Sequence, residues 1–184
     1  MTEQSPIRAL VAYESMFGNT ERVARAVAAG LRLEGIDATV FNVCDSAAAD
    51  LTGVDLIVVG APTHGFSLSR RMTRHDAVRQ GGRERAEQRG MREWLHTLEH
   101  TDRPILAAAF DTRVTKVRYL PASASRRAAR ALSEYGHRMV SPPMGFIVQD
   151  VSGPLESREV DRAIAWSRKV AAEAQNRLAA AATP

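Results

Sequence analysis

The hydrophobic pattern of the chain alternates between short apolar runs and longer stretches in which apolar positions recur every three or four residues. Short apolar runs are typical of buried strands, and the longer spacing is typical of helices with one buried face. After Asp55, the run up to Gly60 is apolar on both faces, as expected of a central strand in a parallel sheet. The predicted strands are Ile7–Tyr13, Ala38–Val43, Val54–Gly60, Pro104–Phe110 and Met139–Val148. The predicted helices cover residues 19–34, 91–98 and 123–135, and a last one follows Ser157.

Strands that alternate with helices predict an α/β fold, in which a doubly wound parallel sheet lies between two layers of helices. We expect one domain over residues 1–184, with an ordered core at about 7–178. The prolines at 142–143 interrupt the last strand, which is therefore expected at an edge or a bend. The polar tract 65–90 is poor core material and is expected to form an insertion or lid loop, with a partly helical insertion and a mobile loop as alternatives. A second polar loop is predicted from Asp111 to Leu120.

The first predicted strand leads into a loop of small and hydroxyl residues, and a helix begins directly after it. The free N–H groups of the first helical turn and the helix dipole favour an anion at this loop. Ser15 and Thr20 add hydroxyl donors, Asn19 adds an amide, and Gly18 lets the backbone approach a ligand. We therefore expect the loop to bind a phosphate without a lysine. Because ligands of doubly wound sheets bind beyond the carboxyl ends of the strands, the loops after the third and fourth strands are expected to meet it there.

Other phosphate and catalytic motifs do not fit this loop. It has neither the Gly-Lys-Ser/Thr of a Walker loop nor a GxGxxG pattern. Ser15 does not lie in a GxSxG motif, which argues against a hydrolase nucleophile. A receiver domain needs an acidic cluster and a phosphorylatable aspartate at a strand end, whereas the third strand ends in Gly60-Ala61-Pro62-Thr63.

Composition and charge narrow the range of partners. The chain carries a formal net charge of +4, and 45% of its residues are hydrophobic, as in soluble globular proteins. Arginines gather at 70–89 and 113–130 and attract acidic partners or phosphates, but no aromatic residues interleave with them, so nucleic acid is not an expected partner. No apolar run approaches the roughly 20 residues of a membrane span, and the N-terminus lacks a signal pattern, so a cytoplasmic location is expected. The histidines show no metal-ligand spacing beyond the pair His96 and His100, and we predict no metal site.

Three stretches resemble the flavin loops of the flavodoxin family, and the resemblance extends from about Ile7 to Leu178. Tyr13-x-Ser15-x-x-Gly18-x-Thr20 resembles the FMN-phosphate signature, Gly60-Ala61-Pro62-Thr63 is similar to the second flavin loop, and the third loop follows Phe110. The family implies a flavodoxin-like sheet of five parallel strands in the order 2-1-3-4-5, with FMN as cofactor. By this resemblance the phosphate binds at Ser15, Met16, Phe17, Gly18, Asn19 and Thr20. The isoalloxazine ring lies between Pro62, Thr63 and His64 on one side and Phe110, Asp111, Thr112 and Arg113 on the other.

The resemblance implies an FMN-binding redox protein that transfers electrons, and two alternatives stay open. Electron-shuttle flavodoxins are acidic and place large aromatics against the ring, whereas this chain is basic and has His64 after Thr63. An FMN-dependent oxidoreductase that acts on quinones or related small molecules is therefore the first alternative. A flavin-free binding or regulatory module is the second, because Glu14 brings a negative charge near the expected phosphate. The expected partner is a redox protein or a small-molecule electron acceptor, NAD(P)H is a candidate donor, and the sequence does not define the oligomeric state.

Overall fold

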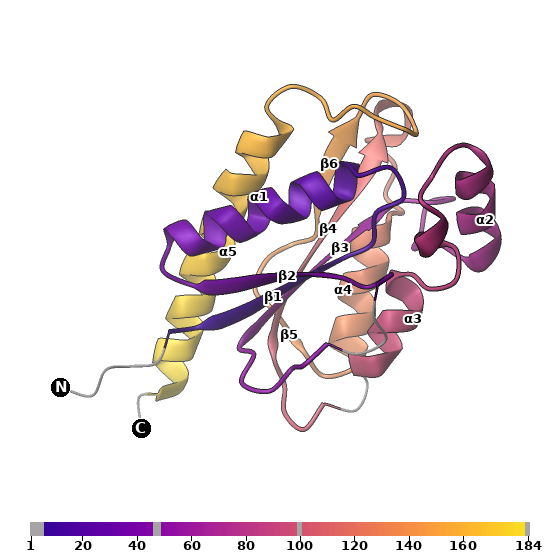
Figure 1. Cartoon of the computed structure of the whole chain (residues 1–184). Coiled ribbons are helices and arrows are strands. Elements are labelled where there is room, and N and C mark those ends of the chain that lie inside the picture. Colours follow the sequence, from indigo (N-terminus) through magenta and orange to yellow (C-terminus); the bar gives the residue numbers. More distant parts are fainter. Residues whose placement is uncertain (1–5, 46–48, 99–100, 183–184) are drawn as a thin grey trace.

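The centre of the fold is a parallel β-sheet, seen in a computed structural model that describes residues 6–45, 49–98 and 101–182 (Figure 1). Its strands are β1 (Arg8–Tyr13), β2 (Asp37–Asn42), β3 (Leu56–Pro62), β4 (Leu106–Val114), β5 (Arg138–Met139) and β6 (Met144–Val148). The order is β2-β1-β3-β4-β5, and β6 pairs with β4 beyond β5. Every ladder between these strands is parallel. The predicted doubly wound sheet with the order 2-1-3-4-5 is therefore confirmed.

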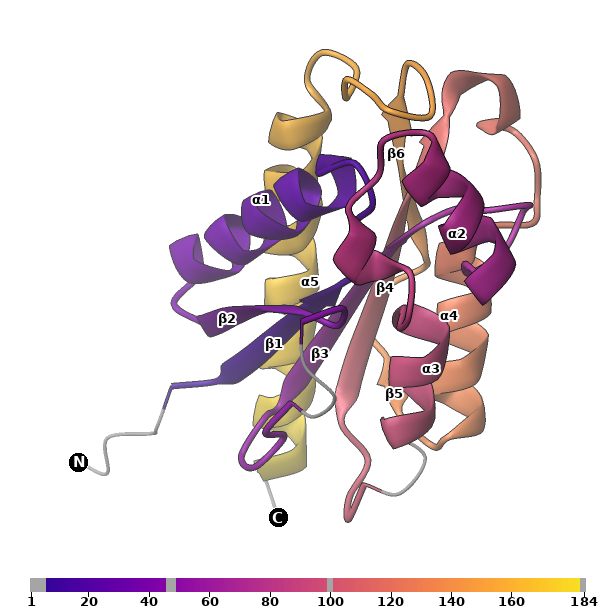
Figure 2. The same cartoon turned by 45° about the vertical axis from the view of Figure 1, so that its right-hand side comes forward.

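Helices cover both faces of the sheet, which gives the three layers that the sequence predicts (Figures 1 and 2). The α-helices are α1 (Asn19–Leu33), α2 (Arg71–Arg79), α3 (Met91–Leu95), α4 (Ala124–Glu134) and α5 (Glu159–Ala182). Short 3-10 helices are η1 (Glu84–Ala86), η2 (His96–Leu98) and η3 (Thr115–Val117). One face of the sheet packs on α1 and α5, and the other packs on α3 and α4. Within the described parts of the chain, no helix combines the length and apolar character needed to cross a bilayer.

Alternation along β1 divides the core between the two faces. Val11 packs with α1 and α5, whereas its neighbours Leu10 and Ala12 pack with α3 and α4. On the first face, the rings of Phe110, Phe146 and Trp166 meet edge to face with centroids 5.9–6.1 Å apart. On the second face, the centroid of Trp94 lies 6.1 Å from that of Phe41. Successive residues of a strand point to opposite faces, so a strand buried on both faces is apolar throughout, as the sequence pattern indicates.

The last two predicted strands differ from the structure at their ends. The predicted strand Met139–Val148 is divided at Pro142 and Pro143 into β5 and β6. Proline has no N–H to donate to a neighbouring strand, so it favours a break in the strand at this point. The predicted loop that starts at Asp111 was wrong for its first residues, because β4 continues to Val114. The cause is tertiary: β6 pairs with residues 110–114 and provides partners for their backbone groups.

The tract 65–90 contributes more to the core than its polar sequence predicts. It folds into α2 and η1, next to the end of β1 (Figure 2). Ala77 and Ala86 are buried against Met16 in a small third hydrophobic cluster. The side chain of Arg74 is fully buried in the same region. The expectation of poor core material was wrong at these positions, and the insertion is partly helical.

His137 couples stability to pH at the start of β5. It is 4% exposed, its Nδ1 accepts a hydrogen bond from the N–H of Ile105 at 3.3 Å, and its Nε2 faces the carbonyl of Leu98 at 3.2 Å. These partners require a neutral ring with the proton on Nε2. Burial lowers the pKa of His137, against a smaller opposing effect of the Leu98 carbonyl.

We expect acidification to destabilise the protein through His137. Because the folded pKa is below the unfolded one of about 6.5, the unfolded chain binds more protons and stability falls as pH drops through that value. Between pH 7.5 and 5.5, the parent protein should lose about 1 kcal/mol more than His137→Gln, whose amide keeps both bonds without titrating. Urea denaturation of both proteins at the two pH values measures this difference. Equal losses in the two proteins would show that His137 is not responsible.

Candidate functional site

The loop between β1 and α1, residues 15–20, is held in place by its own side chains. Gly18 precedes α1 with φ 88°, a left-handed conformation that costs other residues more. The N–H of Gly18 donates to Ser15 Oγ at 3.1 Å, and the side chain of Ser15 is buried. The first N–H groups of an α-helix such as α1 have no carbonyl partner within the helix. The backbone of the 15–20 loop is thus fixed before any ligand binds, and the anion site that its sequence predicts stays a prediction.

Two hydrogen bonds connect the 15–20 loop to distant parts of the chain. Thr20 Oγ1 lies 2.8 Å from Thr112 Oγ1, and both side chains are buried. Asn19 Nδ2 donates to the carbonyl of Ser152 at 3.0 Å, in the segment that follows β6. The carboxyl ends of β1, β4 and β6 are thus joined around one point.

The ends of β3 and β4 form the next wall. The N–H of Thr63 donates to the carbonyl of Thr112 at 2.9 Å, and Thr63 Oγ1 accepts from the N–H of Ala124 at 3.0 Å. His64 follows and forms a bridge with Ser67. Burial lowers the pKa of His64, and the positive charge of Arg74 lowers it further. The ring of His64 is therefore favoured in its neutral form.

Asp111 and Arg113 form a bidentate ion pair at the end of β4. Arg113 Nε and Nη2 each lie 2.7 Å from a carboxylate oxygen of Asp111. Asp111 is fully buried and also accepts bonds from the N–H and the hydroxyl of Ser125, at 3.1 and 2.6 Å. Asp111 fixes Arg113 in one orientation, since a paired guanidinium fork has a defined geometry.

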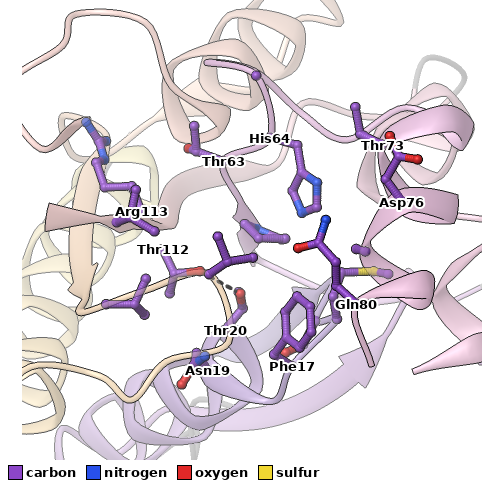
Figure 3. Close-up of a pocket in the computed structure, with 18 residues that line it drawn as sticks. Phe17, Asn19, Thr20, Thr63, His64, Thr73, Asp76, Gln80, Thr112 and Arg113 are labelled. Carbon is purple, nitrogen blue, oxygen red and sulfur yellow. Dashed lines mark hydrogen bonds between the residues drawn. The ribbon is translucent and has the colours of Figure 1, made fainter. Parts of the chain in front are cut away.

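These loops enclose a cavity of about 300 Å³, which we call the loop cavity (Figure 3). It is lined by Ser15, Met16, Phe17, Asn19, Thr20, Pro62, Thr63, His64, Gly65, Thr73, Asp76, Ala77, Gln80, Thr112, Arg113, Val114, Val148 and Val151. His64, Gln80 and Phe17 converge on one side, and the guanidinium of Arg113 points away from them (Figure 3). The cavity combines hydroxyl and amide groups with an apolar wall, the usual composition of a cofactor site.

A buried charge cluster anchors the insertion beside this cavity. Arg74 donates to Ser69 Oγ at 3.1 Å, to Glu93 Oε1 at 3.0 Å and to the carbonyl of Glu87 at 3.1 Å. Glu14 Oε2 accepts from the N–H of Met91 at 2.7 Å, and its side chain is fully buried. Burial raises the pKa of Glu14. Glu14 thus faces α3 and does not line the loop cavity, which removes the charge that favoured a flavin-free module.

Comparison with known proteins connects this geometry to one family. Residues 11–92 match the family model described as flavodoxin. The structure resembles oxidised flavodoxin 2 from Bacillus cereus with a TM-score of 0.67 at 19% identity, covering 90% of this chain and 99% of that chain. The chain has a flavodoxin-like fold, and its N-terminal half resembles the flavodoxin family in sequence. The family has a general flavin-binding redox function.

Two further solved structures show the same fold at low identity. A flavodoxin from the domain Archaea matches with a TM-score of 0.64 at 16% identity and covers 92% of this chain and 99% of that one. A flavodoxin, WrbA-like protein from Agrobacterium tumefaciens matches with a TM-score of 0.59 at 17% identity, over 92% of this chain and 98% of that one. Nearly all of the length of these flavodoxin-like proteins is thus represented in this chain.

The flavodoxin resemblance and the loop cavity overlap in most, but not all, of the expected residues. Gly18, Phe110 and Asp111 do not line the cavity. Gly18 shapes the loop backbone, Phe110 is buried in the core, and Asp111 lies behind Arg113. The other expected residues all line it: Ser15, Met16, Phe17, Asn19, Thr20, Pro62, Thr63, His64, Thr112 and Arg113.

Sequence reasoning missed the contribution of α2 to the cavity. Thr73, Asp76, Ala77 and Gln80 line it, and their spacing places them on one face of a helix. That spacing was a usable signal, but the arginines between these residues concealed it. Of the histidine pair considered for a metal, His96 Nδ1 lies 3.0 Å from the hydroxyl of Tyr135, and His100 lies outside the described residues.

Proposed function

We propose that this chain, which has a flavodoxin-like fold, binds FMN in the loop cavity and transfers electrons through it. The phosphate binds at the 15–20 loop, and the isoalloxazine ring lies beside Pro62–His64 and Thr112–Arg113. The observation that carries the proposal is the convergence of the 15–20 loop and the ends of β3 and β4 on one cavity. A redox protein or a small-molecule electron acceptor is the corresponding partner.

Each wall of the loop cavity has a separate task in this proposal. Backbone N–H groups and the dipole of α1 stabilise the phosphate dianion. Thr20 and Thr112, already 2.8 Å apart, fix the distance between the phosphate and ring subsites. The face of α2 excludes water from the side of Gln80. Bound FMN supplies one- and two-electron transfer, and the protein supplies binding, orientation and electrostatics.

We expect the purified protein to take up FMN and the double variant Asn19→Ala with Thr20→Val to bind it tenfold to a hundredfold more weakly. Loss of one or two hydrogen bonds to a charged group corresponds to about 1.4–2.8 kcal/mol. Visible absorption and titration of the FMN-free protein measure the affinity. The matched control is Thr39→Val with Asn176→Ala, which changes the same residue types at exposed positions on β2 and α5. A folded protein that ignores FMN would contradict the proposal and favour a flavin-free module.

An FMN-dependent oxidoreductase for quinones or related small molecules is the second candidate function. Phe66 and Tyr119, the aromatics nearest to the second and third loops, do not line the loop cavity and are 50% and 84% exposed. A flavin ring that neither Phe66 nor Tyr119 covers is accessible to a small substrate. Turnover of NAD(P)H with a quinone by the FMN-loaded protein distinguishes this enzyme from an electron carrier.

A further inference from the structure

A second cavity lies at the edge of the sheet beside β6 and has a different character from the loop cavity. It measures about 380 Å³ and is lined by four arginines: Arg113, Arg118, Arg126 and Arg162. Tyr119 and the segment 143–147 complete its walls. We call it the arginine cavity. The arginines come from four separate elements or loops (β4, the segment after η3, α4 and α5), so the fold brings them together from distant positions.

The charges around the arginine cavity leave an excess of positive charge inside it. Arg113 is paired with Asp111, and Arg162 Nη1 is paired with Glu159, so two carboxylates lie behind two guanidinium groups. Both carboxylate side chains are less than a tenth exposed. Among the described residues, no carboxylate forms an ion pair with Arg118 or Arg126. A multiply charged anion would therefore find uncompensated guanidinium groups there.

Aromatic and apolar side chains lie beside the charges of the arginine cavity. Tyr119 is 84% exposed, and the guanidinium carbon of Arg118 lies 4.6 Å from its ring centroid, which covers only one face of the ring. Met144 and Ile147 supply apolar surface beside it. Gly145 leaves space for Arg113, since a Cβ there would lie 2.8 Å from Arg113 Nη2. A free aromatic face next to several guanidinium groups suits a ligand with both a planar base and phosphates.

The arginine cavity also adjoins the loop cavity. Arg113 lines both of them. A ligand held by Arg118 and Arg126 therefore lies next to the position proposed for the flavin ring. The side chains of Tyr119, Met144 and Ile147 among the arginines favour a small molecule with a planar base over an acidic protein, which would match a broad charged surface better.

We propose that the arginine cavity binds the diphosphate of a nucleotide, with the phosphates at Arg118 and Arg126 and the base on Tyr119. Binding of the nucleotide does not depend on FMN. Only the role of this binding in electron transfer rests on the proposed function. Two sources share this chemistry: a free nucleoside diphosphate, and a reduced dinucleotide that acts as the electron donor.

Titration with ADP tests the proposal, by calorimetry on the FMN-free and the FMN-loaded protein. We expect ADP to bind and adenosine, which lacks the phosphates, to bind at least tenfold more weakly. The double variant Arg118→Gln with Arg126→Gln should raise the dissociation constant of ADP at least tenfold. The control, Arg138→Gln with Lys169→Gln, removes the same charge at exposed positions on β5 and α5 and should change it less than twofold.

Other ligands then separate the sources and the competing explanation. If NADPH binds the FMN-loaded protein at least fivefold more tightly than ADP, the source is the dinucleotide; equal affinities indicate a free nucleotide. Unchanged ADP affinity in the double variant overturns the proposal. Displacement of ADP by polyglutamate at equal charge concentration also overturns it, because that result would indicate an acidic protein partner. Loss of FMN uptake with intact ADP binding would instead contradict the proposed function and leave this site in place.

Discussion

Replacing Arg74 with methionine is expected to lower the free energy of unfolding by about 3–5 kcal/mol and to weaken FMN binding at the same time. Arg74 is fully buried and donates to Ser69, Glu87 and Glu93. Methionine has a similar length but no donors, so buried acceptors lose their partners and the nearby Glu14 loses a positive neighbour. Because Arg74 connects α2 to the segment before α3, its loss also loosens a wall of the loop cavity.

Urea denaturation and FMN titration of the same variant measure the two effects. The matched control is Arg71→Met, which makes the same change at an exposed position of α2 and should alter stability by less than about 0.5 kcal/mol. If Arg74→Met unfolds before it can be titrated, Arg74→Lys keeps one charge and retains part of the bonding. A loss below about 1 kcal/mol for the methionine variant would show that the cluster does not anchor the insertion.

The second large effect is expected at the crossing of α1 and α5. A Cβ added at Gly30 would lie 2.0 Å from Ser167 Oγ and 2.7 Å from the carbonyl oxygen of Ile164. The backbone carbonyl cannot move without displacing α5. Gly30→Ala should therefore destabilise the protein by about 2–4 kcal/mol, although alanine is favoured over glycine in a helix by about 1 kcal/mol.

The neighbouring position gives a control in which the substitution is reversed and the expected loss of stability is smaller. Ala29→Gly, which is partly exposed on the same helix, should cost only about 1 kcal/mol through helix propensity. Denaturation of both variants checks the comparison. The double variant Gly30→Ala with Ser167→Ala should stay destabilised, because the contact with the Ile164 carbonyl persists. Stabilisation by Gly30→Ala would mean that the two helices lie further apart than described.

The strands and the convergence of the loops could be predicted because both depend on local pattern and general topology. The apolar runs at β1 and β3 are buried on both faces, so their sequence alone indicates a central parallel strand. The carboxyl ends of parallel strands meet at one edge of the sheet, so the sequence predicts that Thr20 and Thr63 lie near the end of β4, as they do.

The insertion and the end of β4 could not be predicted because their structure depends on distant partners. Arginine is rarely buried, and nothing local to Arg74 indicates that Glu93 and Ser69 will surround it. Aspartate is typical of loops, yet pairing with β6 holds Asp111 in a strand. In both cases long-range hydrogen bonds override the local structural preference of the residues. Sequence patterns do not indicate these long-range bonds.

The packing of α1 on α5 has a consequence for how the chain is synthesised. Val23, Val27 and Leu31 of α1 share a core with Val170 and Ala174 of α5, although the two helices are encoded at opposite ends of the sequence. Translation proceeds from the N-terminus, so α1 emerges long before its partner and presents an apolar surface in the meantime. We therefore expect the nascent chain to bind chaperones until α5 leaves the ribosome and closes that face.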